Sequence, residues 1–190
     1  PKTKLGEKMI KAVDETISGV DACLFVIEPK GELRPTEEEL LKKFAQELTL
    51  GPAYLPESKL GPVVTAKHKE SVINWINKGI EEGATLVLDG RDAKVEGYEN
   101  GFYVGPTILD NVTEEMTVGT QEIFGPVLCI KRVKTFEEGL KIMNDNPFAN
   151  GSVIFTQNGY YAREFAKRTD GGMVGVNVGI PVPVGVFPFT

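Results

Sequence analysis

The order of strands and helices in the C-terminal part of this chain most constrains how it can fold. From Val127 onward, short apolar runs alternate with segments whose apolar residues recur at helical spacing, and a capping side chain precedes each helix. Parallel strands need a crossover, which a helix usually supplies, so this order predicts an α/β fold with a mainly parallel sheet and flanking helices. The expected elements are strands over 127–133, 152–156 and 173–178, and helices that begin after Thr135 and Asn158.

The first half of the chain predicts three more helices. Apolar residues recur at every fourth position over 5–17, which places them on one helical face. Thr36 and Glu39 form a capping box ahead of a helix that reaches Leu48, and another helix begins near Thr65. Apolar strands are expected over 22–27 and 84–88.

Composition excludes several classes of function. The 190 residues carry a net charge of -6 with basic and acidic residues interspersed, so no basic patch is available for nucleic acid. No apolar run reaches the roughly 20 residues that a membrane helix needs. The two cysteines lie in no metal-binding or disulfide pattern, which predicts neither a metal site nor a disulfide and favours the cytoplasm.

The segment from Gln121 to Val127 carries the most specific motif. It reads Gln-Glu-Ile-Phe-Gly-Pro-Val and closely resembles the E-[IV]-F-G-P signature of aldehyde dehydrogenases. The resemblance covers about residues 45–190 and implies a truncated part of that family's catalytic domain. Other segments that match in order and approximate spacing are 60–63, 79–84, 90–91, 105–108 and 115–116.

The last part of the chain is similar to one branch of that family. Residues 150–156 and 175–183 resemble the methylmalonate-semialdehyde dehydrogenases. The resemblance implies NAD as cofactor, CoA as acyl acceptor, and malonate or methylmalonate semialdehyde as the small-molecule aldehyde. In that reaction a cysteine thiolate attacks the aldehyde, a hydride passes to NAD, and CoA removes the acyl group. A homo-oligomer is a further expectation from the family.

Residues 1–44 resemble a different family. Residues 1–7 and 21–29 are similar to a stretch of the Era ribosome-assembly GTPase, and the expected order is helix, strand, helix. No phosphate-binding loop precedes this stretch, so we do not expect it to bind GTP. The two resemblances together predict a chimera joined near Phe44 and Ala45. The chain begins with Pro1 and stops within a proline-rich run, so both ends are expected to be cut.

Three residues are predicted to carry function through the resemblance. Glu122 is expected to accept hydrogen bonds from the nicotinamide ribose hydroxyls of NAD, and Phe124 to position the nicotinamide. The alternative for this pair is an exposed acid and a core phenylalanine. Asn177 is expected to line the substrate tunnel, and its alternative is pairing with backbone at the end of a strand.

No catalytic residue is predicted. Cys23 and Cys129 lie in apolar runs, where a thiol is poorly ionised, and neither matches the family's nucleophile loop. His68, the only histidine, is expected to be solvated. The resemblance implies that the nucleophilic cysteine and the general-base glutamate of the family lie upstream of Ala45, so the chain is predicted to lack both and to be an inactive piece of the dehydrogenase. The rival hypothesis is a non-catalytic folded module or a chimeric product without a selected function.

Overall fold

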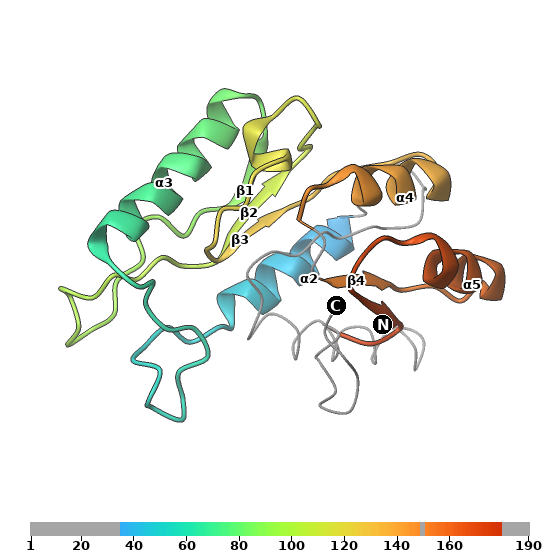
Figure 1. The fold of residues 1–190 in the computed structure, drawn as a ribbon. Coiled ribbons are helices and arrows are strands. Elements are labelled where there is room, and N and C mark those ends of the chain that lie inside the picture. Colours follow the sequence, from blue (N-terminus) through green and yellow to red (C-terminus); the bar gives the residue numbers. More distant parts are fainter. Residues whose placement is uncertain (1–34, 149–150, 180–190) are drawn as a thin grey trace. The chain divides into compact units, whose positions relative to one another are not determined.

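A computed structural model describes residues 35–148 and 151–179 (Figure 1). Of these residues, those from 35 to 132 belong to one compact unit and those from 133 onward to another, so each unit is described by itself. The helix expected over 5–17, the strand expected over 22–27 and the proline-rich tail lie outside the described residues.

The first unit is built on a sheet of three strands in the order β1-β2-β3. β1 (Thr85–Leu88) pairs antiparallel with β2 (Thr107–Asp110), and β2 pairs parallel with β3 (Val127–Cys129). All four residues of β2 are buried, as expected for the central strand of a sheet.

Helix α3 (Ala66–Glu81) packs against this sheet and runs alongside its strands in Figure 1. The Thr65 hydroxyl caps the helix by accepting from the backbone N–H of His68 at 3.1 Å. Val72 and Ile76 are completely buried on the face that meets the sheet. A Cβ on Gly79 would come within 2.9 Å of Leu109, so the glycine lets the helix approach β2 closely. The core cluster is Val72, Ile76, Ala84, Val104, Leu109, Val112, Met116, Val118, Ile123 and Val127.

Helix α2 (Pro35–Gln46) precedes this core and continues without a break across the predicted join at Phe44 and Ala45. It begins one position before Thr36, which the sequence predicted as its cap, because proline suits the first turn of a helix. Ala45 is buried near its end.

The second unit pairs β4 (Gly151–Ile154) in parallel with β5 (Met173–Val176). Its helices are α4 (Phe136–Asp145) and α5 (Gly159–Arg168), and the side chains of Thr135 and Asn158 cap them as predicted. The Arg168 guanidinium contacts the Glu137 carboxylate through both terminal nitrogens and so joins the two helices.

The predicted α/β class, with a mainly parallel sheet and flanking helices, is confirmed. Two details differ. β2 and the short 3-10 helix η2 (Thr117–Gly119) are not predicted by the sequence, and the antiparallel placement of β1 is not predicted either. The sequence also predicts ends for strands β3, β4 and β5 that lie beyond the observed ends at Cys129, Ile154 and Val176.

Candidate functional site

The predicted cofactor residues lie on the loop between η2 and β3. Glu122 and Phe124 are exposed, and the Phe124 side chain keeps 53% of its surface accessible. Ile123 between them is 8% exposed and belongs to the core cluster. This alternation anchors the loop through one side chain and leaves its neighbours facing outward. The alternative in which Phe124 is a core residue is therefore wrong.

The backbone of this loop is fixed on both sides of Phe124. Phe124 has φ 53°, in the left-handed region that a residue with a Cβ rarely adopts. An ideal Cβ on Gly125 would lie 2.8 Å from Cγ2 of Val72, so only glycine lets the loop lie this close to α3. The Thr107 N–H donates to the Pro126 carbonyl at 2.9 Å and joins the end of the loop to β2.

Helix α3 contacts this segment at both of its own ends. In its first turn, Nε2 of His68 lies 2.7 Å from the carbonyl oxygen of Phe124, and the two rings meet edge to face. Just past its last turn, the Glu82 carboxylate accepts from the N–H of Thr117 at 2.6 Å and from its hydroxyl. The segment from 117 to 124 is thus held along the length of one helix. The prediction that His68 is simply solvated is wrong, because its ring is half-buried against Phe124.

The Glu82 contact has an electrostatic consequence. The hydrogen bond from the Thr117 hydroxyl lowers the pKa of the Glu82 carboxyl below its ordinary value of 4.5, against an opposing effect of burial. The Thr117 backbone N–H and the Lys78 ammonium lower it further. Glu82 therefore acts as an ionised cap on η2 at neutral pH.

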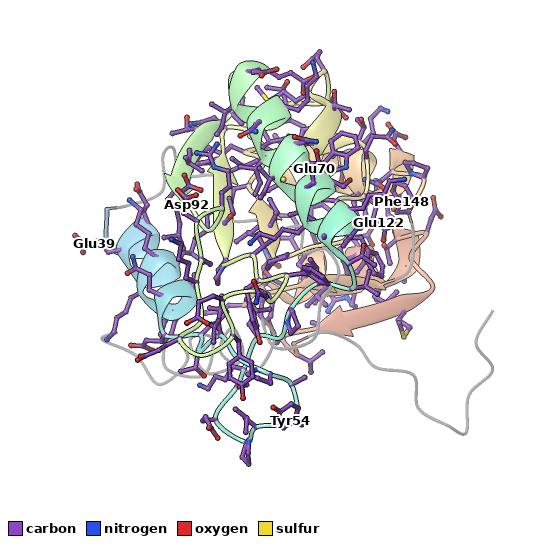
Figure 2. All side chains as sticks on the ribbon, turned by 90° about the vertical axis from the view of Figure 1, so that its left-hand side faces the viewer. Glu39, Tyr54, Glu70, Asp92, Glu122 and Phe148 are labelled. Carbon is purple, nitrogen blue, oxygen red and sulfur yellow. The ribbon has the colours of Figure 1, made fainter. Side chains whose placement is uncertain are left out.

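Glu122 differs from Glu82 in how its carboxylate is placed. Among the described residues its carboxylate makes no hydrogen bond and no ion pair. Figure 2 shows its side chain beside the N-terminal turns of α3. A free carboxylate offers two oxygen acceptors to a ligand, and the exposed Phe124 ring two positions on offers an apolar face.

Asn177 lies in the second unit, just after β5, and has φ 54°. Its side-chain oxygen accepts from the Thr156 N–H at 2.8 Å, and its side-chain nitrogen donates to the Thr156 carbonyl at 2.9 Å. The pairing with backbone that the sequence left open is therefore observed. The substrate-tunnel role stays a prediction, and it has to be compatible with an amide that already has two partners.

The remaining candidates are the two cysteines, and the structure describes one of them, Cys129. Desolvation raises the pKa of the Cys129 thiol from its ordinary 9.0 to about 11, so this cysteine is protonated and structural at neutral pH. Cys23 lies outside the described residues. Within residues 35–148 and 151–179, no group of histidine, cysteine and acidic side chains is arranged to hold a metal ion. No helix in these ranges is long and apolar enough to span a membrane.

Most of the sequence matches a known family. The model of the aldehyde dehydrogenase family matches residues 33–190. The chain belongs to the aldehyde dehydrogenase family. The family match begins at residue 33, within the stretch predicted to resemble a GTPase, and the predicted division at residue 44 stays a prediction.

Relatives within the family indicate which of its enzymes this chain is similar to. The acylating methylmalonate-semialdehyde/malonate-semialdehyde dehydrogenase of Rattus norvegicus is 49% identical over 160 residues, which are 84% of this chain and 30% of the relative. The malonate-semialdehyde dehydrogenase of Halalkalibacterium halodurans is 42% identical over 165 residues, 87% of this chain and 34% of the relative. The homologues of this chain therefore include malonate- and methylmalonate-semialdehyde dehydrogenases.

A solved structure of a related protein has a similar fold. A protein from Sinorhizobium meliloti 1021, assigned as a methylmalonate-semialdehyde dehydrogenase and complexed with NAD, superposes with a TM-score of 0.80 at 37% identity. The alignment covers 100% of this chain and 39% of the solved chain. The predicted likeness to part of the family's catalytic domain and the NAD dependence of the family are thereby confirmed. The chain spans between 30% and 39% of the length of these three relatives.

Proposed function

We propose that this chain supplies the nicotinamide-ribose side of the active site in an NAD-dependent, CoA-acylating semialdehyde dehydrogenase. The observation that carries the proposal is that one loop presents an exposed Phe124 ring and a Glu122 carboxylate that has no partner within residues 35–148 and 151–179. The loop is held against α3 by contacts at both ends of the helix, so these two side chains are presented from a fixed backbone.

The chemistry of the two side chains fits the cofactor. The Glu122 carboxylate would accept hydrogen bonds from the two ribose hydroxyls, and a hydrogen bond to an ionised acceptor is stronger than a neutral one. The Phe124 ring would pack against the nicotinamide and limit the orientations it can adopt. When bound, NAD is the hydride acceptor of the reaction.

The proposed substrates are malonate semialdehyde and methylmalonate semialdehyde, with CoA as acyl acceptor. The names of the relatives state the two semialdehydes and an acylating reaction. CoA as the acyl acceptor comes from the resemblance of the sequence to the family. We assign no nucleophile or general base among the described residues. Burial raises the thiol pKa of Cys129 to about 11, which makes this cysteine a poor nucleophile. The proposal is that the chain alone does not turn over.

Three further parts of the proposal come from the sequence. The GTPase-like origin of residues 1–44 makes the chain a chimera, the cysteine usage favours a cytoplasmic location, and the family favours a homo-oligomer. A continuous sequence read across codons 40–50 tests the chimera. Cell fractionation tests the location, and sedimentation of the purified chain tests the oligomer.

The experiment that tests the cofactor proposal is an NMR titration of the full chain with NAD. Glu122→Gln removes the charge from the loop, and Glu70→Gln is a matched control because Glu70 is an exposed glutamate on α3. Loss of one charge-assisted hydrogen bond of about 1.5–3 kcal/mol weakens NAD binding roughly tenfold or more in Glu122→Gln. The proposal predicts no change in Glu70→Gln. Equal affinities for the wild type and Glu122→Gln would contradict it, as would NAD reduction by the chain alone with semialdehyde and CoA.

A further inference from the structure

His68 makes the contact that holds the loop at the N-terminal end of α3, and this contact reaches Phe124 itself. Its Nε2 atom lies 2.7 Å from the carbonyl oxygen of Phe124, a residue 56 positions away in the sequence. The centroids of the two rings are 6.1 Å apart, and the ring planes are inclined at 68°. A side chain on the first turn of α3 thus touches both the backbone and the ring of Phe124.

Phe124 needs such a contact to keep its conformation. Its φ of 53° lies in the left-handed region, where a residue with a Cβ is destabilised by roughly 1–2 kcal/mol. Burial does not hold the residue, because the side chain is 53% exposed. Ile123 and Gly125 fix the chain on either side, but the orientation of the Phe124 peptide depends on what its carbonyl binds.

His68 is well placed to provide that contact, since its own backbone is fixed. Its N–H donates to the hydroxyl of Thr65, the N-cap of α3, at 3.1 Å. A histidine that carries its proton on Nε2 donates to a carbonyl, and this bond selects that tautomer. The imidazole therefore extends from a rigid helix turn to the loop.

We propose that His68 is a positioning residue, which holds Phe124 in its left-handed conformation so that its ring is presented to the nicotinamide. The inference rests on the proposed function for the contact with NAD. The claim that His68 holds the backbone conformation of Phe124 does not rest on the proposed function, because it concerns the chain without a ligand. If Phe124 samples other conformations when the hydrogen bond is lost, apparent NAD affinity falls by the fraction of molecules that keep the competent one.

Two substitutions separate the hydrogen bond from the ring contact. His68→Phe keeps an aromatic ring but has no donor, whereas His68→Gln keeps an N–H donor without the ring. Lys67→Gln is the control, because Lys67 is exposed in the same turn. Each full-length variant is measured twice: by the intraresidue Hα–HN NOE of Phe124, which a positive φ makes strong, and by NMR titration with NAD.

The proposal predicts that His68→Phe loses the strong NOE of Phe124 and binds NAD about fivefold more weakly, as expected for one lost hydrogen bond of about 1 kcal/mol. His68→Gln keeps the NOE and binds within about twofold of the wild type, as does Lys67→Gln. An unchanged NOE in His68→Phe would overturn the positioning role whether or not NAD binds. Absence of NAD-induced shifts at Glu122 and Phe124 in the wild type would instead count against the proposed function.

Discussion

Gly125→Ala is the most informative single substitution in the loop, because it adds one methyl group at the point where the loop meets α3. The new Cβ would lie 2.8 Å from Cγ2 and 3.0 Å from Cγ1 of Val72, whereas carbon atoms in contact are usually about 3.5–4.0 Å apart. Val72 is completely buried and β-branched on a helix, so its side chain has no other rotamer to move into. Either the helix or the loop must move.

The expected loss of stability follows from two opposing effects. Adding a methylene-sized group to a packed core destabilises by about 1–3 kcal/mol. Replacing glycine by alanine also restricts the unfolded chain, which stabilises by about 0.4–1 kcal/mol where the backbone allows alanine. Gly125 is not among the glycines with positive φ, so its backbone is compatible with alanine. The net prediction is a destabilisation of about 1–2 kcal/mol.

Urea unfolding followed by tryptophan fluorescence measures this change. Trp75 is the only tryptophan, and it packs against the core cluster that contains Val72. The urea midpoint should fall by about 0.5–1 M at an unchanged slope. Gly61→Ala is the control, because its added Cβ would meet Ala53 at an ordinary 3.5 Å, and it should leave the midpoint unchanged or raise it.

A second variant identifies the clash as the cause. Val72→Ala removes both methyl groups that the new Cβ would meet, so the double variant should be about 1 kcal/mol more stable than the sum of the single changes predicts. A Gly125→Ala variant as stable as Gly61→Ala would refute the close packing of the loop on α3. Strict additivity in the double variant would refute the steric explanation.

Three further predictions concern single side chains. In a Cys23→Ser background at pH 8, native Cys129 should react with a thiol reagent about a hundredfold more slowly than in urea, since its pKa is raised from 9.0 to about 11; equal rates would contradict its burial. Because the pKa of the Cys129 thiol is raised, the stability that the protonated thiol contributes is complete below pH 9 and is lost as pH rises toward 11. Glu82 has a lowered pKa, so the stability that its ionised carboxylate contributes is complete above pH 4.5 and is lost as pH falls. The urea midpoint of Glu82→Gln should therefore fall less in acid than that of the wild type. The same pH profile in both proteins would contradict this. Arg132→Met should destabilise by about 2–4 kcal/mol in urea unfolding, because it leaves the buried Asp110 carboxylate without its cation; a loss below about 0.5 kcal/mol would refute the importance of this pair.

The elements that the sequence predicts well are those with local signals. Thr65, Thr135 and Asn158 each cap the helix that follows them, and a cap depends on contacts within one turn. β2 lacks such a signal: it is four residues long, stands between Pro106 and Asn111, and is buried throughout, so no alternation marks it. Its position between β1 and β3 depends on pairing with distant segments.

In the candidate site, too, the sequence predicts the residues that have a local signal and misses those that depend on distant contacts. Glu122 and Phe124 are predicted as site residues because they lie within one continuous motif, and their exposure is compatible with a ligand-facing role. His68 was missed because its partner is 56 residues away and its neighbours are lysines, which are typical of a solvated helix turn. The left-handed Phe124 was missed too, since that conformation is held by tertiary contacts and not by the residue's own preference.

The most direct test of the account is an intermolecular NOE measurement on the full chain with labelled phenylalanine and saturating NAD, with the Phe124 signals assigned from Phe124→Leu. The account predicts NOEs between the ring protons of Phe124 and those of the nicotinamide, and their loss in Phe124→Leu. NOEs from NAD to other phenylalanines alone would show that this loop does not form the nicotinamide-ribose side of the site.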